Sequence, residues 1–295
     1  MSAIPTTTSS NISSGLLASS MGPWTRARRA WPQFLGVTLL LLFLICCATP
    51  AATPASTPSK PSICKQSTID ALSALHANLE FPDYLAEGGA RKPAEEFDVN
   101  ETFSVLSHLS MEPGYALDYV YYSEFVGGLP VLYARPVDRA PYLTYAELIT
   151  ATNTAASSPP PANYREYVRV DGTAEGFFEL ALFHLMGNQF YLSWHAGYND
   201  ATAICDRSGL EAIVSALEKS KFGQPITAKQ ARQARALDLE PVVEFEDDTV
   251  TVKFVSFTRW GGFLQNTFTF RRESPHALIA SDETELVPYE CGVVF

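Results

Sequence analysis

The last quarter of the chain alternates apolar and polar residues, and this period of two constrains the fold more than any other feature. The alternation runs through residues 239–272 and is interrupted by Asp247-Asp248 and by Gly261-Gly262. Side chains of a strand point alternately to its two faces, and Asp and Gly are typical of tight turns. The segment therefore predicts a three-stranded antiparallel meander with one apolar face.

The rest of the region after residue 64 mixes helical and strand patterns. Two β-branched and aromatic runs at 115–125 and 129–135 flank Gly127-Gly128, which predicts a hairpin. Apolar residues at helical spacing predict helices within 65–81, 98–111, 144–152, 173–186 and 208–220. Shorter strands are expected at 189–197 and 201–205. Strands and helices do not alternate regularly, so the predicted class is α+β, with helices packed on antiparallel β-hairpins and a C-terminal antiparallel meander.

Residues 1–47 have the composition of an N-terminal extension followed by an export leader. Three arginines within 26–29 precede an apolar run at 34–45, and this order is typical of signal peptides. The basic flank favours a cytoplasmic N-terminus and export of the chain after the apolar run. Because the pattern begins at Met21, we expect Met21 to be the working initiator.

The apolar run ends in Leu44-Ile45-Cys46-Cys47, which resembles the lipoprotein box of bacterial exported proteins. The resemblance implies acylation of Cys47, although Cys46 stands where that motif usually has Gly, Ala or Ser. Ordinary cleavage near 48–52 and an uncleaved anchor are the alternatives, and the apolar run is shorter than the ~20 residues of a spanning helix. All three alternatives predict an exported protein, anchored or released at the outer face of the cytoplasmic membrane or the cell surface.

Residues 48–63 alternate proline with Ala, Thr and Ser, a composition that forms neither a helix nor a core. Such segments stay extended and semi-stiff, so we expect a tether between the membrane and an exported globular region at 64–295. Within that region, the proline-rich polar loop at 152–163 is the candidate boundary between two subdomains.

The negative net charge of the chain argues against nucleic acid as a partner. The chain carries a net charge of −11, and its three charges before residue 48 are all arginines, which leaves a net charge of −14 for the remainder. Nucleic-acid binding needs clustered Lys and Arg, so we expect no nucleic-acid partner.

Three cysteines belong to the exported region: Cys64, Cys205 and Cys291. In an oxidising compartment two of them can pair. The favoured hypothesis is a bond between Cys205 and Cys291, which would attach the C-terminal tail to the body, and the alternative is three free thiols. The Cys and His spacings match no zinc motif, so neither a metal nor a cofactor is predicted.

The richest polar and aromatic cluster is the segment 190–200, FYLSWHAGYND. Its candidate ligand-binding residues, together with an aromatic residue of the glycine turn at 259–263, are Trp194, His195, Tyr198, Asp200 and Trp260. Loops at strand ends commonly carry binding residues. The same residues also fit a core position for Trp194 and a simple turn for the rest.

These patterns favour a membrane-tethered, non-enzymatic binding or interaction domain of the cell envelope. Its partners would be the membrane, through the leader, and an envelope protein, peptidoglycan or a small solute. The alternative is an envelope hydrolase that uses groups around His195 and Asp200. Nucleophile, metal-protease and nucleotide motifs are absent from the sequence, so no catalytic residue is assigned.

Overall fold

The computed structural model describes residues 62–86, 90–91, 96–123, 127–153, 163–194, 198–221 and 223–292. These residues belong to one compact unit. The predicted leader, the lipidation candidate Cys47 and nearly all of the tether lie outside the described residues. The same holds for most of the loop at 152–163, so the subdomain boundary stays a prediction.

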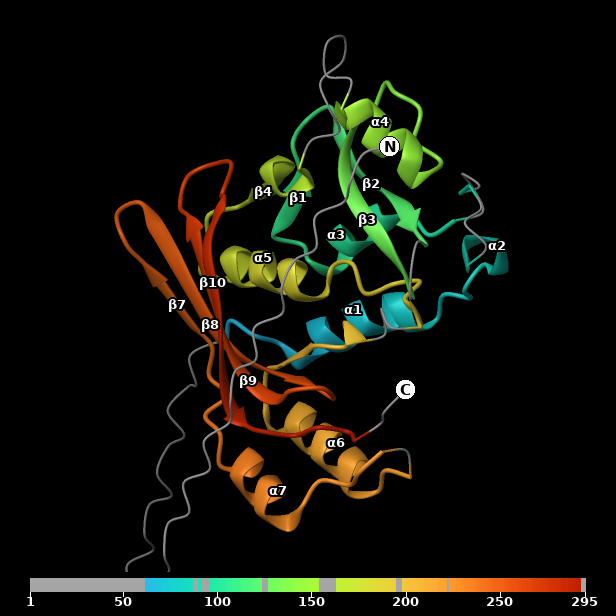
Figure 1. The fold of residues 1–295 in the computed structure, drawn as a ribbon. Coiled ribbons are helices and arrows are strands. Elements are labelled where there is room, and N and C mark those ends of the chain that lie inside the picture. The colour runs from blue at the N-terminus through green and yellow to red at the C-terminus, as the bar shows by residue number, and fades with distance from the viewer. Residues whose placement is uncertain are drawn as a thin grey trace, which may run out of the picture. The chain divides into compact units, whose positions relative to one another are not determined.

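The predicted α+β class is confirmed (Figure 1). The helices are α1 (Gln66–Ala77), α2 (Asp83–Ala86), η1 (Val99–Glu101), α3 (Thr102–Val105), α4 (Tyr145–Asn153), η2 (Tyr164–Tyr167), α5 (Ala174–Met186), α6 (Arg207–Glu218) and α7 (Ala228–Arg235). The strands are β1 (Leu109–Met111), β2 (Tyr115–Tyr122), β3 (Gly127–Pro136), β4 (Val168–Val170), β5 (Ser193–Trp194), β6 (Thr202–Ile204), β7 (Val242–Phe245), β8 (Thr249–Thr258), β9 (Gly262–Arg271) and β10 (Leu278–Val287).

The predicted meander forms the centre of a five-stranded antiparallel sheet. Strands β7, β8 and β9 are joined by turns at the two predicted positions, while β6 and β10 add to β8 and β9. Strand β10 follows β9 along the sheet, with irregular register near each of its ends. Its outer edge pairs with no other described strand.

The two faces of this sheet contact different helices. Val250, Val252 and Phe254 of β8 point to the face covered by α5, within the main hydrophobic cluster. Val255 and Phe257 point to the opposite face, where α6 and α7 complete a second cluster. Figure 1 shows α6 and α7 at the end of the long strands away from α5. Burial of apolar side chains on both faces stabilises the middle of the sheet at about 25 cal/mol per Å².

The two smaller sheets are formed by strands β1 to β5. The predicted hairpin is confirmed as β2 and β3, and β5 pairs with the start of β3. Strands β1 and β4 form a separate antiparallel pair. The main hydrophobic cluster contains residues from α1, β2 and α5 together with the long sheet.

Local geometry shortens two predicted elements. The helix expected at 98–111 is reduced to η1 and α3, because the chain leaves helical geometry at Leu106 and enters β1 at Leu109. The strand expected at 189–197 is reduced to β5, and Tyr191 just before it has a positive φ of 49°. Helix α7 was not predicted.

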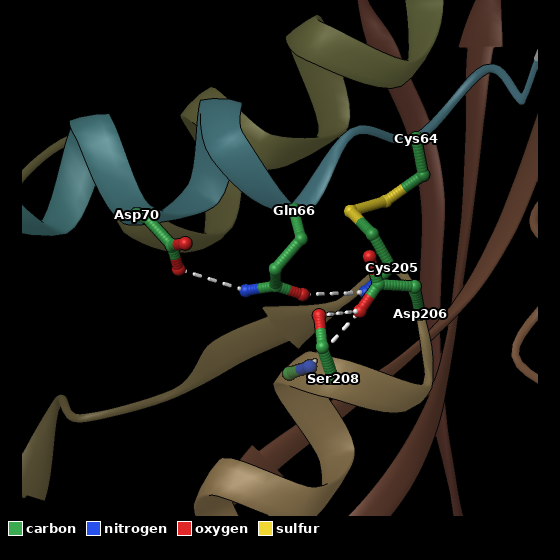
Figure 2. The surroundings of a disulfide bond; sticks show 7 residues. Cys64, Gln66, Asp70, Cys205, Asp206 and Ser208 are labelled. Carbon is green, nitrogen blue, oxygen red and sulfur yellow. Dashed lines mark hydrogen bonds between the residues drawn. A yellow bond between two sulfur atoms is a disulfide. The ribbon is translucent and has the colours of Figure 1, made fainter.

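The predicted disulfide between Cys205 and Cys291 is wrong, because Cys205 has another partner. Cys205 pairs with Cys64, at a Cα–Cα distance of 5.2 Å (Figure 2). Cys291 is a buried free thiol. Gln66 at the start of α1 accepts a hydrogen bond from the backbone N–H of Cys205 at 3.2 Å. The first turn of α1 therefore lies beside the end of β6, which brings the two cysteines together.

Cys291 is held by backbone contacts instead. Its N–H donates to the carbonyl of Arg259 at 3.0 Å, and its carbonyl accepts from Gln224 at 2.7 Å. These two bonds attach the C-terminal tail to the body, which is the role that the predicted disulfide was expected to have.

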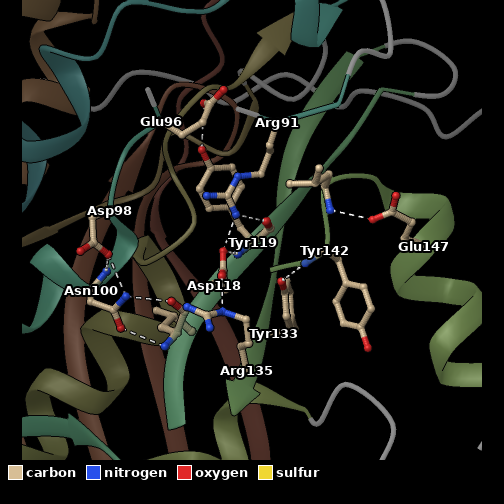
Figure 3. A network of polar contacts seen from close by, with 12 residues as sticks. Arg91, Glu96, Asp98, Asn100, Asp118, Tyr119, Tyr133, Arg135, Tyr142 and Glu147 are labelled. Carbon is tan, nitrogen blue, oxygen red and sulfur yellow. Dashed lines mark hydrogen bonds and ion pairs between the residues drawn. The ribbon is translucent and has the colours of Figure 1, made fainter. Parts of the chain in front are cut away.

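A buried ion-pair network fixes the β2–β3 hairpin to the segment before α3 (Figure 3). Asp118 of β2 binds the guanidinium groups of Arg91 and of Arg135, the latter at 2.7 Å. Arg91 also lies 3.8 Å from the ring centroid of Tyr119, whose hydroxyl donates to Glu96 at 3.1 Å. With Asp118 and Arg91 less than a tenth exposed, this network orders the chain on one side of the hairpin.

Candidate functional site

The structure brings together three of the five predicted binding residues. Asp200 accepts hydrogen bonds from the hydroxyl of Thr258 and, at 3.1 Å, from the N–H of Arg259. The Tyr198 ring lies edge-on to Trp260, with 4.3 Å between centroids. These contacts attach the turn at 198–200 to the β8–β9 turn.

The hydrogen bonds of Asp200 hold the turn at 198–200 to the β8–β9 turn. Both of its carboxylate oxygens accept hydrogen bonds from the β8–β9 turn. Only the backbone of Trp194 is described, and as part of β5 it pairs with Gly127 of β3. His195 lies outside the described residues. No contact therefore tests the combination of His195 with Asp200.

A cavity of about 550 Å³ borders the same turn and includes Asn199 in its wall. It opens between η2, the second half of α5, and the β9–β10 edge of the long sheet. The lining residues are Arg165, His184, Leu185, Asn199, Phe268, Leu278, Ser281, Asp282 and Glu283. We name it the His184 pocket. Its volume is within the range of small-molecule sites, ~300–1,000 Å³.

The polar wall near the turn is built from amides. Gln189 donates to the side chain of Asn199 at 3.4 Å and to the carbonyl of Ala201 at 2.8 Å. Asn199 in turn donates to the side chain of Asn188 at 3.2 Å. These bonds connect the wall to the C-terminal end of α5, which positions the neighbouring His184.

His184 lies in an aromatic environment. Its ring centroid is 5.2 Å from that of Phe270 and 6.1 Å from that of Phe268, and its nitrogens have no hydrogen-bond partner among the described residues. Burial, followed by the positive charge of Arg165, lowers the pKa of His184 to about 3. The imidazole is therefore neutral near pH 7, with one donor and one acceptor nitrogen.

A second polar group lies around His108. Antiparallel pairing of Leu109 with Val170 places the residues that flank this pair, His108 and Asp171, next to each other. Nδ1 of His108 is 2.6 Å from Oδ2 of Asp171. The other Asp171 oxygen accepts from the hydroxyl of Thr173 at 2.6 Å and from its N–H at 3.0 Å, so the carboxylate is fixed on both sides.

These contacts shift the protonation of both partners. The hydrogen bond to Asp171 raises the pKa of His108. Burial alone would raise the pKa of Asp171, but its hydrogen bonds with Thr173 and His108 outweigh burial and lower it. Glu179 of α5 is buried, which raises the pKa of its carboxyl, and it accepts from the His108 N–H at 2.8 Å. His108 is consequently held through both its ring and its backbone.

A cavity of about 440 Å³ adjoins this group. It is lined by Ser107, His108, Leu109, Ser110, Arg169, Val170, Asp171, Ser274 and His276. The hydroxyls of these three serines make no hydrogen bond with His108 or with other described residues. The arrangement has the histidine–carboxylate orientation of general-base sites, without a serine already bonded to the imidazole.

Sequence reasoning missed both groups for different reasons. His184 lies in an apolar helix, where a histidine is usually a core residue, and only the structure shows that its nitrogens lack hydrogen-bond partners among the described residues. His108 and Asp171 are 63 positions apart, and no motif connects them. The one local signal near this pair was Thr173, at which the helix predicted at 173–186 begins.

The described part of the chain contains neither a metal-binding cluster nor a helix that could span a membrane. No three His, Cys, Asp or Glu side chains there lie in an arrangement that would hold a metal ion. None of the described helices combines the length and apolarity needed to span a membrane. No protein-family model, curated protein or solved structure matches the sequence or the fold.

Proposed function

We propose that the chain is an exported, membrane-tethered protein of the cell envelope whose folded body binds a small ligand without catalysing a reaction. The Cys64–Cys205 disulfide is the observation that carries this proposal. Structural disulfides persist in oxidising compartments outside the bacterial cytoplasm and are rare inside it. A disulfide thus agrees with the export leader expected from the sequence.

The position of the disulfide supports a tether. Cys64 comes directly after the proline-rich segment at 48–63, and its bond leads to Cys205 between β6 and α6. Any pull on the N-terminal segment is transmitted through a covalent bond to the centre of the body, rather than to α1 alone. This is a suitable attachment for a domain held at a membrane surface.

The His184 pocket supports ligand binding. It combines apolar surface from Leu185, Phe268 and Leu278 with a few polar groups, the composition typical of small-molecule sites. It also borders the turn at 198–200, which was expected from the sequence to bind a ligand. The residues that attach this turn to the body hold the pocket wall in place.

Export and anchoring are tested by protease treatment of intact cells and spheroplasts that express the full chain. We expect the body to be degraded in spheroplasts without lysis and to fractionate with membranes. Cys47→Ala abolishes the mass increase of acylation if Cys47 is the lipidated residue, and Cys46→Ala is the matched control. Protection of the body until the cells are lysed would contradict export.

A hydrolase is the second candidate, and the His108–Asp171 pair favours it. Here His108 takes a proton from a water molecule that attacks an ester carbonyl carbon, while Asp171 orients the imidazole. The C–O bond to the leaving alcohol then breaks, and the protonated His108 returns the proton to the leaving oxygen. Asp200 is engaged by the β8–β9 turn, which makes His108 the better-supported base of the two histidines considered. The sequence alternative around His195 remains untested.

The hydrolase candidate is tested with activated esters such as p-nitrophenyl acetate. If His108 is the base, His108→Gln and Asp171→Asn each lower the rate by about 100-fold or more, in the range of general-base catalysis. Glu211→Gln, which removes an exposed ion pair with Arg235 between α6 and α7, serves as the control. Equal rates for all variants and a protein-free blank would exclude this candidate.

A further inference from the structure

The His184 pocket is lined by residues of opposite charge. Arg165 comes from η2, and Asp282 and Glu283 come from β10. Among the described residues, Arg165 forms no ion pair with either carboxylate. The pocket therefore presents a separated positive and negative group, each still able to bind a ligand.

We propose that the His184 pocket binds a small zwitterion whose carboxylate is bound by Arg165 and whose ammonium group is bound by Glu283. The ligand class is that of free amino acids or short peptides with an apolar or aromatic body. The inference rests on the proposed ligand-binding function and specifies it.

Arg165 has the donors that a carboxylate requires. Its Nε atom donates to the Tyr164 hydroxyl at 3.2 Å, and its guanidinium carbon lies 5.5 Å from the centroid of the Tyr164 ring. Its two terminal nitrogens make no hydrogen bond with described residues. A planar guanidinium with both terminal nitrogens available binds a carboxylate through two parallel hydrogen bonds. The contact with Tyr164 holds the side chain in place for this purpose.

Strand register selects Glu283 over Asp282 as the carboxylate of the pocket. Ser281 is directly opposite Phe268, and Glu283 is opposite Asn266, whereas Asp282 is opposite Thr267. Directly opposed residues share one face of a sheet, and neighbours along a strand alternate. Glu283 and Ser281 thus share the face of Phe268, which lines the pocket, and Asp282 points to the other face.

The pocket lining also includes apolar and uncharged side chains. Leu185, Phe268 and Leu278 are apolar, and His184 is neutral near pH 7 because its pKa is far below the ordinary value. Phe268 is only 9% exposed, which makes it a rigid wall. A ligand with charged ends and an apolar body therefore matches the combination of charged and apolar groups in the lining. A cavity of about 550 Å³ has room for an amino acid or a dipeptide.

The test is isothermal titration calorimetry on the full-length chain in detergent, with four probes of one side chain. The probes are L-phenylalanine, N-acetyl-phenylalanine without the ammonium group, phenylalaninamide without the carboxylate, and the dipeptide phenylalanyl-phenylalanine. We expect each blocked probe to bind about tenfold more weakly than the free amino acid, since a lost charge-assisted hydrogen bond costs on the order of 1.4 kcal/mol. Tighter binding of the dipeptide than of L-phenylalanine assigns the ligand to peptides, and the reverse assigns it to free amino acids.

The variants separate the two ends of the ligand. Arg165→Gln should weaken L-phenylalanine and N-acetyl-phenylalanine but not phenylalaninamide, and Glu283→Gln should weaken L-phenylalanine and phenylalaninamide but not N-acetyl-phenylalanine. Arg232→Gln, at an exposed arginine of α7, is the matched control and should leave all affinities unchanged. Asp282→Asn, on the opposite face of β10, should weaken the same probes less than Glu283→Gln does. Equal loss for Asp282→Asn and Glu283→Gln would overturn the assignment of Glu283.

A second readout separates failure of this inference from failure of the proposed binding function. The ring resonances of His184, assigned by comparison with His184→Phe, report any ligand in the pocket. Shifts caused equally by phenylalanine, by its blocked forms and by neutral aromatics such as phenol would retain ligand binding and overturn the preference for zwitterions. Unchanged resonances with every probe would contradict both the zwitterion and the proposed small-molecule site.

Discussion

The Nδ1 atom of His108 lies 2.6 Å from Oδ2 of Asp171, although the two residues are 63 positions apart in the chain. The short pairing of β1 with β4 creates this contact, because both residues directly adjoin the paired Leu109 and Val170. The contact predicts how the histidine titrates, whether or not the group is catalytic.

We expect His108 to titrate above its ordinary pKa of ~6.5, and Asp171→Asn to lower that pKa because the charged acceptor is lost. A folded-state pKa above the unfolded value means that the stabilisation is complete below pH ~6.5 and is lost as pH rises through the folded pKa. The measurement is a histidine NMR titration of both proteins. Asp206→Asn, a change at the N-cap of α6, is the control, and an unchanged His108 pKa in Asp171→Asn would contradict the assignment.

His184 and His76 predict the opposite dependence on pH. Burial lowers the pKa of His184 to about 3 and that of His76 to about 4. The unfolded chain therefore takes up these protons below pH ~6.5, and the free energy of unfolding falls by about 1.4 kcal/mol per pH unit for each histidine. This loss continues from pH ~6.5 down to the folded pKa.

Urea unfolding between pH 7 and pH 5 measures this dependence. His184→Phe should reduce the slope by the contribution of one histidine, while Leu185→Met on the same helix should leave it unchanged. An identical slope in the wild type and in His184→Phe would show that His184 is not buried in its neutral form.

The disulfide predicts a large effect on stability. Cys64 and Cys205 are 141 positions apart, and closure of a loop of this length stabilises the folded state by about 3–5 kcal/mol in the chain-entropy description. Cys64→Ser with Cys205→Ser should show this loss in urea unfolding. Cys291→Ala, which removes a buried thiol without a disulfide, should cost only about 1 kcal/mol, and an equal loss in both proteins would contradict the pairing.

The buried network predicts a second large effect. Asp118→Asn leaves Arg91 and Arg135 without their shared carboxylate, and removal of one partner from a buried ion pair costs about 3–5 kcal/mol. Glu112→Gln breaks the exposed ion pair with Arg169 and should cost about 0–1 kcal/mol. Thermal unfolding of the two variants compares these values, and a loss below about 1 kcal/mol for Asp118→Asn would show that the network does not stabilise the fold.

The features predicted correctly from the sequence are those with local causes. The alternation around Val250 and Val252, and the turns on either side of β8, determine the meander over a few residues. Helix α5 was predicted from its apolar run, and it begins where that run starts because Thr173 accepts from the N–H of Gly176. Helix α7 was missed because its apolar contact is limited to Ala231 and Ala234.

Features that depend on distant contacts were not predictable in the same way. Cys64 lies beside Cys205 only because the start of α1 packs against the end of β6, and no spacing in the sequence reports that contact. The charges of the His184 pocket come from η2 and β10, which are far apart in the chain. The contact between the turn at 198–200 and Trp260 was likewise not predicted, since the sequence named these residues only as candidate binding residues. In the structure, Asp200 holds this turn to the β8–β9 turn.

The most direct test of the central claim, an exported and tethered body, is the thiol state of Cys64 and Cys205 in living cells. Cells that express the full chain, or a chain without residues 1–47, are alkylated with N-ethylmaleimide and analysed by mass spectrometry. The account predicts an oxidised Cys64–Cys205 pair in the full chain and two alkylated thiols in the shortened chain retained in the cytoplasm. Alkylated Cys64 and Cys205 in the full chain, in cells whose exported control proteins are oxidised, would contradict it.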